Sequence, residues 1–183
     1  RRPDEIRVFP GIQPIVGRTM AEAQEKYEEL RAMVDDALGI AAVARLAGGV
    51  DIFSMNPDGP LPPLKPSNAA RARQDRIVAM GKRGMTIREI GRVLAMSQTH
   101  RVIWGTPQSI ADGLTEWLEA GAADGFNLLF AHYPKPLEEW VDMVIPELQR
   151  RGLFRTEYES TTFRGNLGVP IPQNRFAKNR RSV

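Results

Sequence analysis

The sequence has 183 residues, of which 42% are hydrophobic and 26% are charged, and its formal net charge is +3. This composition excludes an intrinsically disordered chain, which would have few large apolar residues and a high net charge. The sequence has no cysteine, which excludes a disulfide framework, a thiolate zinc site and a cysteine nucleophile. No apolar run reaches the ~18 residues that cross a bilayer, and no signal-peptide pattern opens the sequence. We therefore expect a soluble cytoplasmic protein without membrane contact.

The positive charge is concentrated at the carboxyl end. Residues 160–183 contain five basic side chains and no acidic ones. Without these five, residues 1–159 hold 20 basic and 22 acidic side chains, a net charge of −2. A short basic end on a slightly acidic body is typical of a solvated terminus rather than of a DNA-binding arm. We expect 1–159 to form the folded body, and 160–183 to wrap the surface or to be disordered.

The first predicted elements are a strand and a helix. Residues 6–16 are rich in β-branched and apolar side chains, and Pro10 and Gly11 interrupt them, which favours a strand that bends or ends beside a pocket. Thr19 stands three residues before Glu22, the spacing of a capping box, and apolar residues follow at helical spacing. This pattern predicts a helix over about 20–36. The small apolar residues of 38–50 predict either its continuation or a second short helix.

The middle of the chain combines a proline-rich loop with two helices. Residues 51–68 contain five prolines and predict an irregular loop. Residues 71–80 predict a short charged helix, and Thr86 with Glu89 forms a second capping box. Residues 86–101 also resemble a helix-turn-helix, whose second helix would enter the DNA major groove. That helix would run directly into a β-branched segment, which makes it a poor recognition helix.

The last predicted elements alternate between strand and helix. Residues 100–104 are extended and β-branched, and Thr106 with Pro107 then begins a helix. Residues 126–130 predict a short buried strand, and a final helix from about residue 137 is broken or kinked at Pro146. This alternation predicts an α/β fold with parallel strands and crossover helices. Because only two or three strands are evident, the sequence has the pattern of part of an α/β fold rather than of a whole one.

No strong catalytic motif is present in the sequence: it has no phosphate-binding glycine loop, no HExxH and no GxSxG. Four residues are nevertheless candidates for a pocket. His132 follows the strand 126–130, and α/β folds place their sites at the carboxyl ends of strands. Trp104 ends the extended segment 100–104, and Phe53 and Met55 lie in the proline-rich loop, which could form a lid. For each of these residues the alternative is a packing role, and for the loop the alternative is disorder. Because the sequence has two histidines, we expect no metal site.

Four stretches of the sequence resemble one protein family. They are residues 6–30, 50–61 (VDIFSMNPDGPL), 100–130 and 144–172. They are similar to the carboxyl-terminal part of luciferase-like flavin monooxygenases in the nitrilotriacetate and dibenzothiophene-sulfone monooxygenase branch. The run AADGFN, followed by PELQRRGLFRTEYE, is the part most specific to that branch, and residues 69–99 match least.

The resemblance implies the carboxyl-terminal portion of a (β/α)8 TIM barrel, in a fold more than twice as long as this chain. Residues 7–16 would be its seventh strand and 126–130 its eighth, with a helical insertion at about 48–100 and an extension at the carboxyl end. Such enzymes take reduced FMN from a separate NAD(P)H-dependent flavin reductase. With O2 the flavin forms a peroxyflavin, which oxygenates a small organic substrate.

In this family the residues that hold FMN lie mostly in the first six strand–helix units, so the resemblance assigns no catalytic or cofactor-binding residue here. It implies a wall of the substrate pocket made of Trp104, Phe130, His132, Phe53 and Met55. We therefore predict part of an FMN-dependent monooxygenase, an oxidoreductase that forms a homo-oligomer and has no nucleic-acid partner. We expect the isolated chain to be inactive. The alternative is a stand-alone nucleic-acid-binding module that uses residues 86–101.

Overall fold

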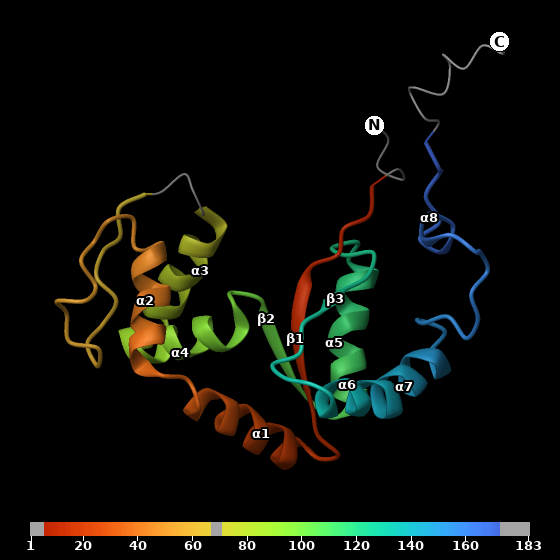
Figure 1. The fold of residues 1–183 in the computed structure, drawn as a ribbon, viewed down its shortest axis with the longest axis horizontal. Coiled ribbons are helices and arrows are strands. Elements are labelled where there is room, and N and C mark those ends of the chain that lie inside the picture. Colours follow the sequence, from red (N-terminus) through yellow and green to blue (C-terminus); the bar gives the residue numbers. More distant parts are fainter. Residues whose placement is uncertain (1–5, 67–70, 173–183) are drawn as a thin grey trace, which may run out of the picture.

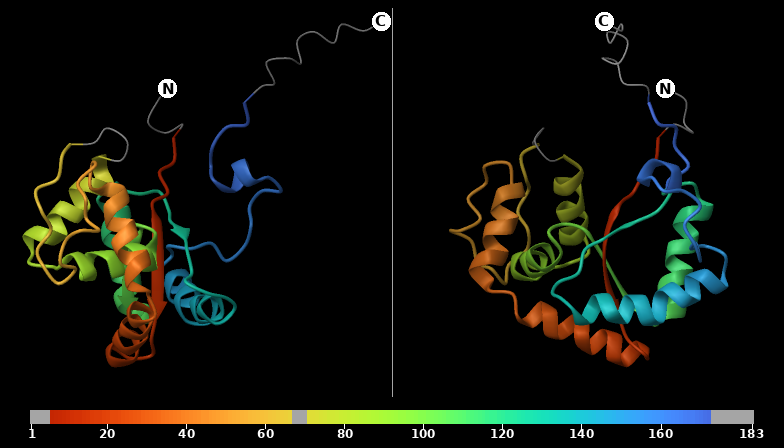
Figure 2. Two further views of the ribbon diagram at one scale, coloured as in Figure 1. Left: turned by 60° about the vertical axis from the view of Figure 1, so that its left-hand side comes forward. Right: turned by 45° about the vertical axis from the view of Figure 1, so that its right-hand side comes forward.

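The computed structural model describes residues 6–66 and 71–172. In these residues a parallel sheet of three strands lies between two groups of helices (Figures 1 and 2). The central strand is β1 (Gly11–Val16), with β2 (Arg101–Gly105) on one side and β3 (Asn127–Leu128) on the other. β1 pairs with β2 from Ile12 to Val16, and with β3 at Gly11 and Ile12. The α/β prediction is confirmed.

One face of the sheet is covered by helices from the carboxyl-terminal half of the chain. These are α5 (Pro107–Glu119), α6 (Lys135–Glu139), the π-helical turn η2 (Trp140–Val144) and α7 (Ile145–Arg150). Because side chains alternate along a strand, Ile12 and Val16 point to this face. They form a buried sheet cluster with Ile110, Ala111, Leu114, Trp140, Val144 and Leu148.

The predicted final helix is continuous in the chain but changes its winding. Pro146 has no N–H to donate to the carbonyl four residues earlier, and the helix widens into η2 immediately before it. The predicted break at Pro146 is therefore wrong: the helix continues through this residue, and the widened turn lies before it.

The second group of helices belongs to the amino-terminal half. α1 (Met20–Ala32) crosses the carboxyl ends of the strands, and α2 (Asp36–Leu46), α3 (Arg71–Lys82) and α4 (Ile87–Ser97) lie beyond it (Figure 1). α2, α3 and α4 enclose a separate helical cluster that includes Val43, Ile77, Ile90 and Leu94. The loop 51–66 has no helix or strand, as predicted.

The predicted helix over 20–36 was too long, and the alternative of a second short helix is correct. The Asp35 side chain accepts hydrogen bonds from the backbone N–H groups of Ala37 and Leu38, so it caps a new helix instead of continuing α1. The two predicted capping boxes begin helices where expected: Thr19 accepts from the Glu22 N–H, and Thr86 and Glu89 bond reciprocally.

The predictions for the first and the last strand in the chain were longer than the paired segments. β1 begins at Gly11 rather than at Ile6, because Pro10 has no N–H to donate to a ladder. Of residues 126–130 only Asn127 and Leu128 pair with β1, while Phe126 and Phe130 pack against the sheet cluster.

The helix-turn-helix interpretation of residues 86–101 is wrong. α4 ends at Ser97, and Gln98 and Thr99 turn the chain with φ angles of 49° and 72°. β2 then begins at Arg101, so residues 86–101 contain one helix and not two. Among the described residues, no helix has the length and apolar character that a membrane crossing requires.

Candidate functional site

The carboxyl ends of β1 and β3 meet α1 and α6 around a cavity of about 280 Å³. This edge is where parallel α/β sheets place their ligands, because the loops that follow the strands converge there. α1 follows β1 closely, since Thr19 caps it three residues after Val16. Residues of β1, of α1 and its end, of α6, and of the segment that follows β3 line the cavity: Pro14, Ile15, Val16, Lys26, Glu29, Leu30, Met33, Ala131, His132, Lys135, Pro136 and Glu139.

Lys26 is the most connected polar side chain of this cavity. Its Nζ donates to the carbonyl oxygen of Val16 at 2.8 Å and to Glu139 Oε1 at 2.9 Å. It also pairs with Glu22 Oε1 at 2.9 Å, one turn earlier on α1. A single ammonium group therefore joins the last carbonyl of β1 to α1 and α6, and it holds the mouth of the cavity together.

The surroundings of Lys26 keep it charged. Burial by itself lowers the pKa of Lys26, but the hydrogen bonds to Glu139 and Glu22 outweigh burial, so the pKa is raised from its ordinary value. The hydrogen bond from Lys26 in turn lowers the pKa of Glu22. Lys26 therefore serves as a fixed cation that organises the edge of the sheet, and it is not a proton acceptor at neutral pH.

The residues around this cavity do not fit the phosphate of FMN. A phosphate site needs several N–H donors or cations that are not already bonded to carboxylates. Lys26 is bonded to two carboxylates and a carbonyl, and Glu29 and Glu139 add negative charge. The other cation of the cavity, Lys135, is exposed.

Of the five residues predicted to line a substrate pocket, His132 lies at this cavity. It is exposed and lines the rim, beside the carboxyl end of β1. Trp104 lies at the same edge of the sheet, opposite Ile15 in the β1–β2 register. Its ring stacks on Tyr27 of α1, with ring centres 5.9 Å apart and planes inclined by 22°. Trp104 thus packs β2 against α1.

The other three predicted residues are not gathered at the cavity. Phe130 packs against the sheet cluster and meets Tyr133 edge-on at 5.8 Å between ring centres. Met55 packs against the helical cluster, and Phe53 is 68% exposed in the loop 51–66. The structure therefore brings His132 and Trp104 to one edge, and it places Phe53 and Met55 on a different part of the molecule.

Sequence reasoning missed Lys26 and Glu139 as residues of the site. The spacing of Glu22 and Lys26 is visible in the sequence as an ordinary helical ion pair. Glu139, however, is 113 residues from Lys26, and no local pattern connects them. Only the packing of α6 against the end of β1 brings the two together.

Comparison with known proteins shows which enzymes this chain is similar to. No family model matches the chain. N-acetyl-S-(2-succino)cysteine monooxygenase of Bacillus subtilis (strain 168) is 41% identical over 181 residues, which cover 97% of this chain and 41% of that protein. Nitrilotriacetate monooxygenase component A of Aminobacter aminovorans is 39% identical over 180 residues, 97% of this chain and 40% of that protein.

A solved structure agrees with these relatives. The crystal structure of DmoA from Hyphomicrobium sulfonivorans matches with a TM-score of 0.72 and 27% identity, over 88% of this chain and 34% of that one. The chain is homologous to luciferase-like, flavin-dependent monooxygenases. Its relatives at 34–41% identity include nitrilotriacetate and dibenzothiophene-sulfone monooxygenases, which confirms the resemblance seen in the sequence. The chain spans about two-fifths of the length of the curated relatives that it matches.

Proposed function

We propose that this chain is the carboxyl-terminal part of a two-component monooxygenase that uses reduced FMN to oxygenate a small organic substrate. The observation that carries the proposal is identity of 39–41% to monooxygenases along 97% of the chain. The names of two relatives describe parts of larger systems: one is component A of nitrilotriacetate monooxygenase, and the other is one of the subunits of pristinamycin IIA synthase. Such names support a separate flavin reductase as the source of the reduced flavin.

The barrel interpretation is part of this proposal. β1 and β3 are parallel neighbours, as two successive strands of a (β/α)8 barrel would be. β2 lies on the other side of β1, directly after the region proposed as an insertion. Because the cavity beside Lys26 does not fit the FMN phosphate, we assign the main flavin contacts to residues outside this chain.

The residues of this chain would form one wall of the substrate pocket. Lys26 holds the end of β1 in place, and His132 stands at the rim, where its imidazole can donate a hydrogen bond to a polar substrate. Trp104, at the same edge of the sheet, remains a proposed wall residue, whereas Phe130, Phe53 and Met55 stay predictions, because the structure does not gather them at this cavity. When bound, the flavin would supply the oxygen chemistry, while His132 and Trp104 would orient the substrate and exclude water.

An exchange experiment tests the proposal. The matching two-fifths of nitrilotriacetate monooxygenase component A is replaced by this chain, and the hybrid protein is supplied with FMN, NADH, a flavin reductase and O2. We expect product from at least one compound named for the relatives: nitrilotriacetate, N-acetyl-S-(2-succino)cysteine or dibenzothiophene sulfone. The isolated 183-residue chain, assayed in parallel, should form none.

Two controls make the result decisive. Quenching of FMN fluorescence and far-ultraviolet circular dichroism establish that the hybrid is folded and binds flavin. His132→Ala in the hybrid should raise KM more than it lowers kcat, because His132 stands at the rim of the cavity. A folded, flavin-binding hybrid that oxygenates none of the substrates would contradict the proposed function.

A further inference from the structure

A second and larger cleft lies at the opposite, amino edge of the sheet. It has a volume of about 640 Å³, within the range of pockets that bind small molecules. One side is formed by α5, α7 and the residues that precede β1 and β3. The other side is formed by residues 153–167, called the arm below, which include the short helix α8 (Phe163–Asn166).

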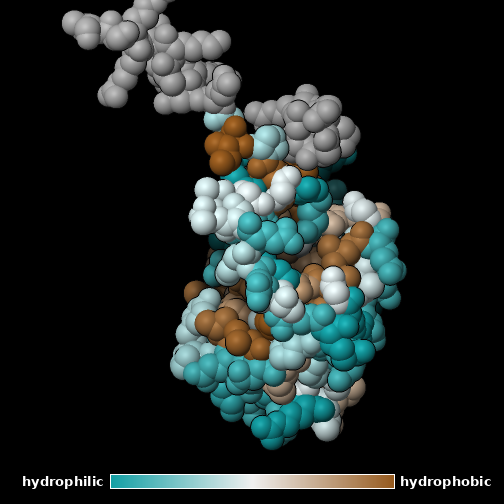
Figure 3. All heavy atoms as spheres, turned by 90° about the vertical axis from the view of Figure 1, so that its right-hand side faces the viewer, coloured by the Kyte–Doolittle hydropathy of each residue, from teal (hydrophilic) through white to brown (hydrophobic). Residues whose placement is uncertain are grey.

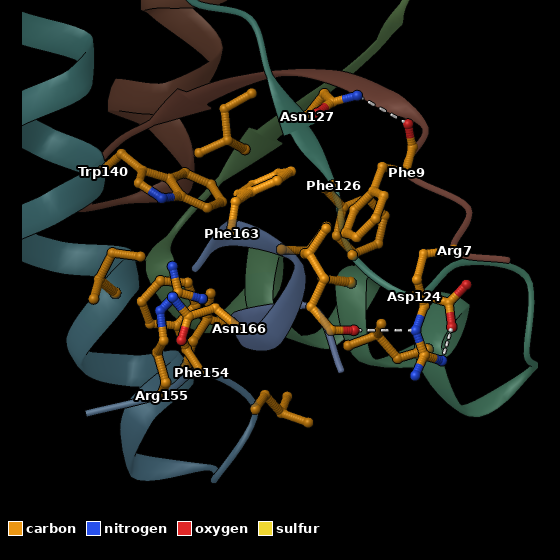
Figure 4. Close-up of a pocket in the computed structure, with 18 residues that line it drawn as sticks. Arg7, Phe9, Asp124, Phe126, Asn127, Trp140, Phe154, Arg155, Phe163 and Asn166 are labelled. Atoms are coloured by element: carbon orange, nitrogen blue, oxygen red, sulfur yellow. Dashed lines mark hydrogen bonds and ion pairs between the residues drawn. The ribbon is translucent and has the colours of Figure 1, made fainter. Parts of the chain in front are cut away.

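The walls of the cleft are mainly aromatic and aliphatic. Figure 4 shows the rings of Phe9, Phe126, Trp140, Phe154 and Phe163 around its interior. Phe163 is 79% exposed and Leu153 is 37% exposed, although both line the cleft. On the side of the molecule that carries α7 and the arm, hydrophobic surface is exposed in separate patches (Figure 3). An apolar ligand in the cleft would remove part of this surface from water.

The arm is held to the body of the protein at both of its ends. Arg7 Nε donates to the carbonyl oxygen of Leu167 at 3.3 Å, and Arg7 Nη1 pairs with Asp124 at 3.0 Å. At the other end, Gln149 Nε2 donates to the carbonyl oxygen of Arg155 at 3.0 Å. These contacts connect the arm to the start of β1 and to α7, so the cleft is a built feature of the fold.

The cleft carries one positive charge that no carboxylate neutralises. Within residues 6–66 and 71–172, Asp124 pairs with Arg7, whereas Arg155 forms no salt bridge. The guanidinium of Arg155 lies 4.8 Å from the ring centre of Phe154 and 4.5 Å from that of Tyr158. Arg155 Nη2 also donates to the Tyr158 hydroxyl at 3.3 Å. These contacts hold the guanidinium in place, and its Nε and Nη1 have no hydrogen-bond partner among the described residues.

A second donor lies beside Arg155. Asn166 uses its Oδ1 to accept the backbone N–H of Ser160 at 3.0 Å, which leaves its amide NH2 to donate. Figure 4 shows Arg155, Asn166 and Phe154 together at one end of the cleft, while Arg7 and Asp124 lie at the other. One end of an apolar cleft thus offers a cation and an amide donor, the combination that binds a carboxylate or sulfonate.

We propose that this cleft binds a small organic anion with a flat apolar body. Its carboxylate or sulfonate would meet Arg155 and Asn166, and its apolar part would lie against Phe126, Trp140 and Phe163. The cleft lies at the edge of the sheet opposite the cavity at Lys26 and His132, so this binding is separate from the proposed oxygenation and does not depend on it.

The test compares two dyes of similar shape that differ in charge. The chain is titrated with anionic 8-anilino-1-naphthalenesulfonate and with neutral N-phenyl-1-naphthylamine, and the rise in dye fluorescence reports binding. We expect one sulfonate dye per chain. Arg155→Gln should weaken the anionic dye about fivefold, the scale of an exposed ion pair, and leave the neutral dye unchanged. Arg155→Lys should retain part of the affinity.

Two further variants locate the dye. Phe163→Ala should weaken both dyes, and its side chain is so exposed that folding should tolerate the change. Arg45→Gln, at an exposed position of α2, is the charge-matched control and should change neither. The proposal is overturned if the sulfonate dye does not bind at one per chain, or if its affinity is the same in Arg155→Gln and Phe163→Ala as in the unchanged protein.

Discussion

The contact between α2 and α4 depends on two glycines that allow their backbones to approach. Gly39 of α2 faces Gly91 of α4, and both are buried. A Cβ added at Gly91 would lie 2.6 Å from the carbonyl carbon of Gly39 and 2.7 Å from its oxygen. Both are backbone atoms, which cannot rotate away as the end of a side chain can. We therefore expect Gly91→Ala to force the two helices apart.

The cost of this separation can be worked out from the structure. To restore an ordinary contact of 3.4 Å from 2.6 Å, the helices must separate locally by about 0.8 Å. A gap of that size removes roughly a quarter to a half of the dispersion attraction across the contact. Overpacking of this kind costs ~1–3 kcal/mol, against which alanine regains ~1 kcal/mol of helix propensity. We expect Gly91→Ala to lower the free energy of unfolding by up to about 2 kcal/mol.

Gly113 of α5 is the matched control. It is also a helical glycine, but an added Cβ there would meet no atom within 4 Å. Gly113→Ala should therefore raise the free energy of unfolding by ~0.5–1 kcal/mol through propensity alone. Urea unfolding followed by circular dichroism at 222 nm measures both variants. If Gly91→Ala proves as stable as Gly113→Ala, the close approach of α2 and α4 does not limit the packing of these helices.

Three other predictions concern buried or half-buried polar groups. Hydrogen bonds from Arg150 and Arg151 lower the pKa of Glu147 to about 2, from an ordinary 4.5. As the pH falls, this carboxylate is protonated in the unfolded chain before it is protonated in the folded one. Its contribution to the free energy of unfolding is therefore complete above about pH 4.5 and is lost as the pH falls toward 2. In urea unfolding at a series of pH values, the free energy of unfolding should fall less steeply with acid in Glu147→Gln than in the unchanged protein. Glu25→Gln, at an exposed position, should behave like the unchanged protein. The same acid dependence in both variants would refute the assignment. Gln13 is 3% exposed and its Nε2 has no partner among the described residues, so Gln13→Met should raise the free energy of unfolding by ~1 kcal/mol, and a lower urea midpoint would contradict this. Lys26→Met leaves Glu139 and the end of β1 without their common donor; hydrogen exchange at residues 15–17 should become faster, and unchanged exchange would show that Lys26 does not hold this edge.

Local signals in the sequence were sufficient for most of the helices. Thr19, Thr86 and Thr106 each accept a hydrogen bond from a backbone N–H three residues later. Such a cap is complete within one turn, so it can be found in the sequence without knowledge of the fold. The same locality explains why β1 begins only at Gly11, since Pro10 lacks a donor wherever it lies in the sheet.

The class of protein was also readable from the sequence. Residues 100–130 and 144–172 carried the resemblance to flavin-dependent monooxygenases, and relatives at 39–41% identity confirm it. The individual pocket residues were not readable in this way. Trp104, Phe130 and Met55 each have an aromatic or apolar side chain that suits both a pocket and a core, and the structure packs all three against neighbouring side chains.

Only the tertiary structure decided which strands are neighbours and which side chains meet. β3 lies beside β1 rather than beside β2, although β2 precedes it in the chain. Lys26 reaches Glu139 across 113 residues, and Arg7 reaches Leu167 across 160. Hydrogen bonds of this kind depend on where whole elements dock. Docking follows from burial of apolar surface, which is proportional to area and is not tied to any spacing along the chain. Caps and turns can therefore be predicted from the sequence, whereas the cavity and the cleft form only when the elements pack.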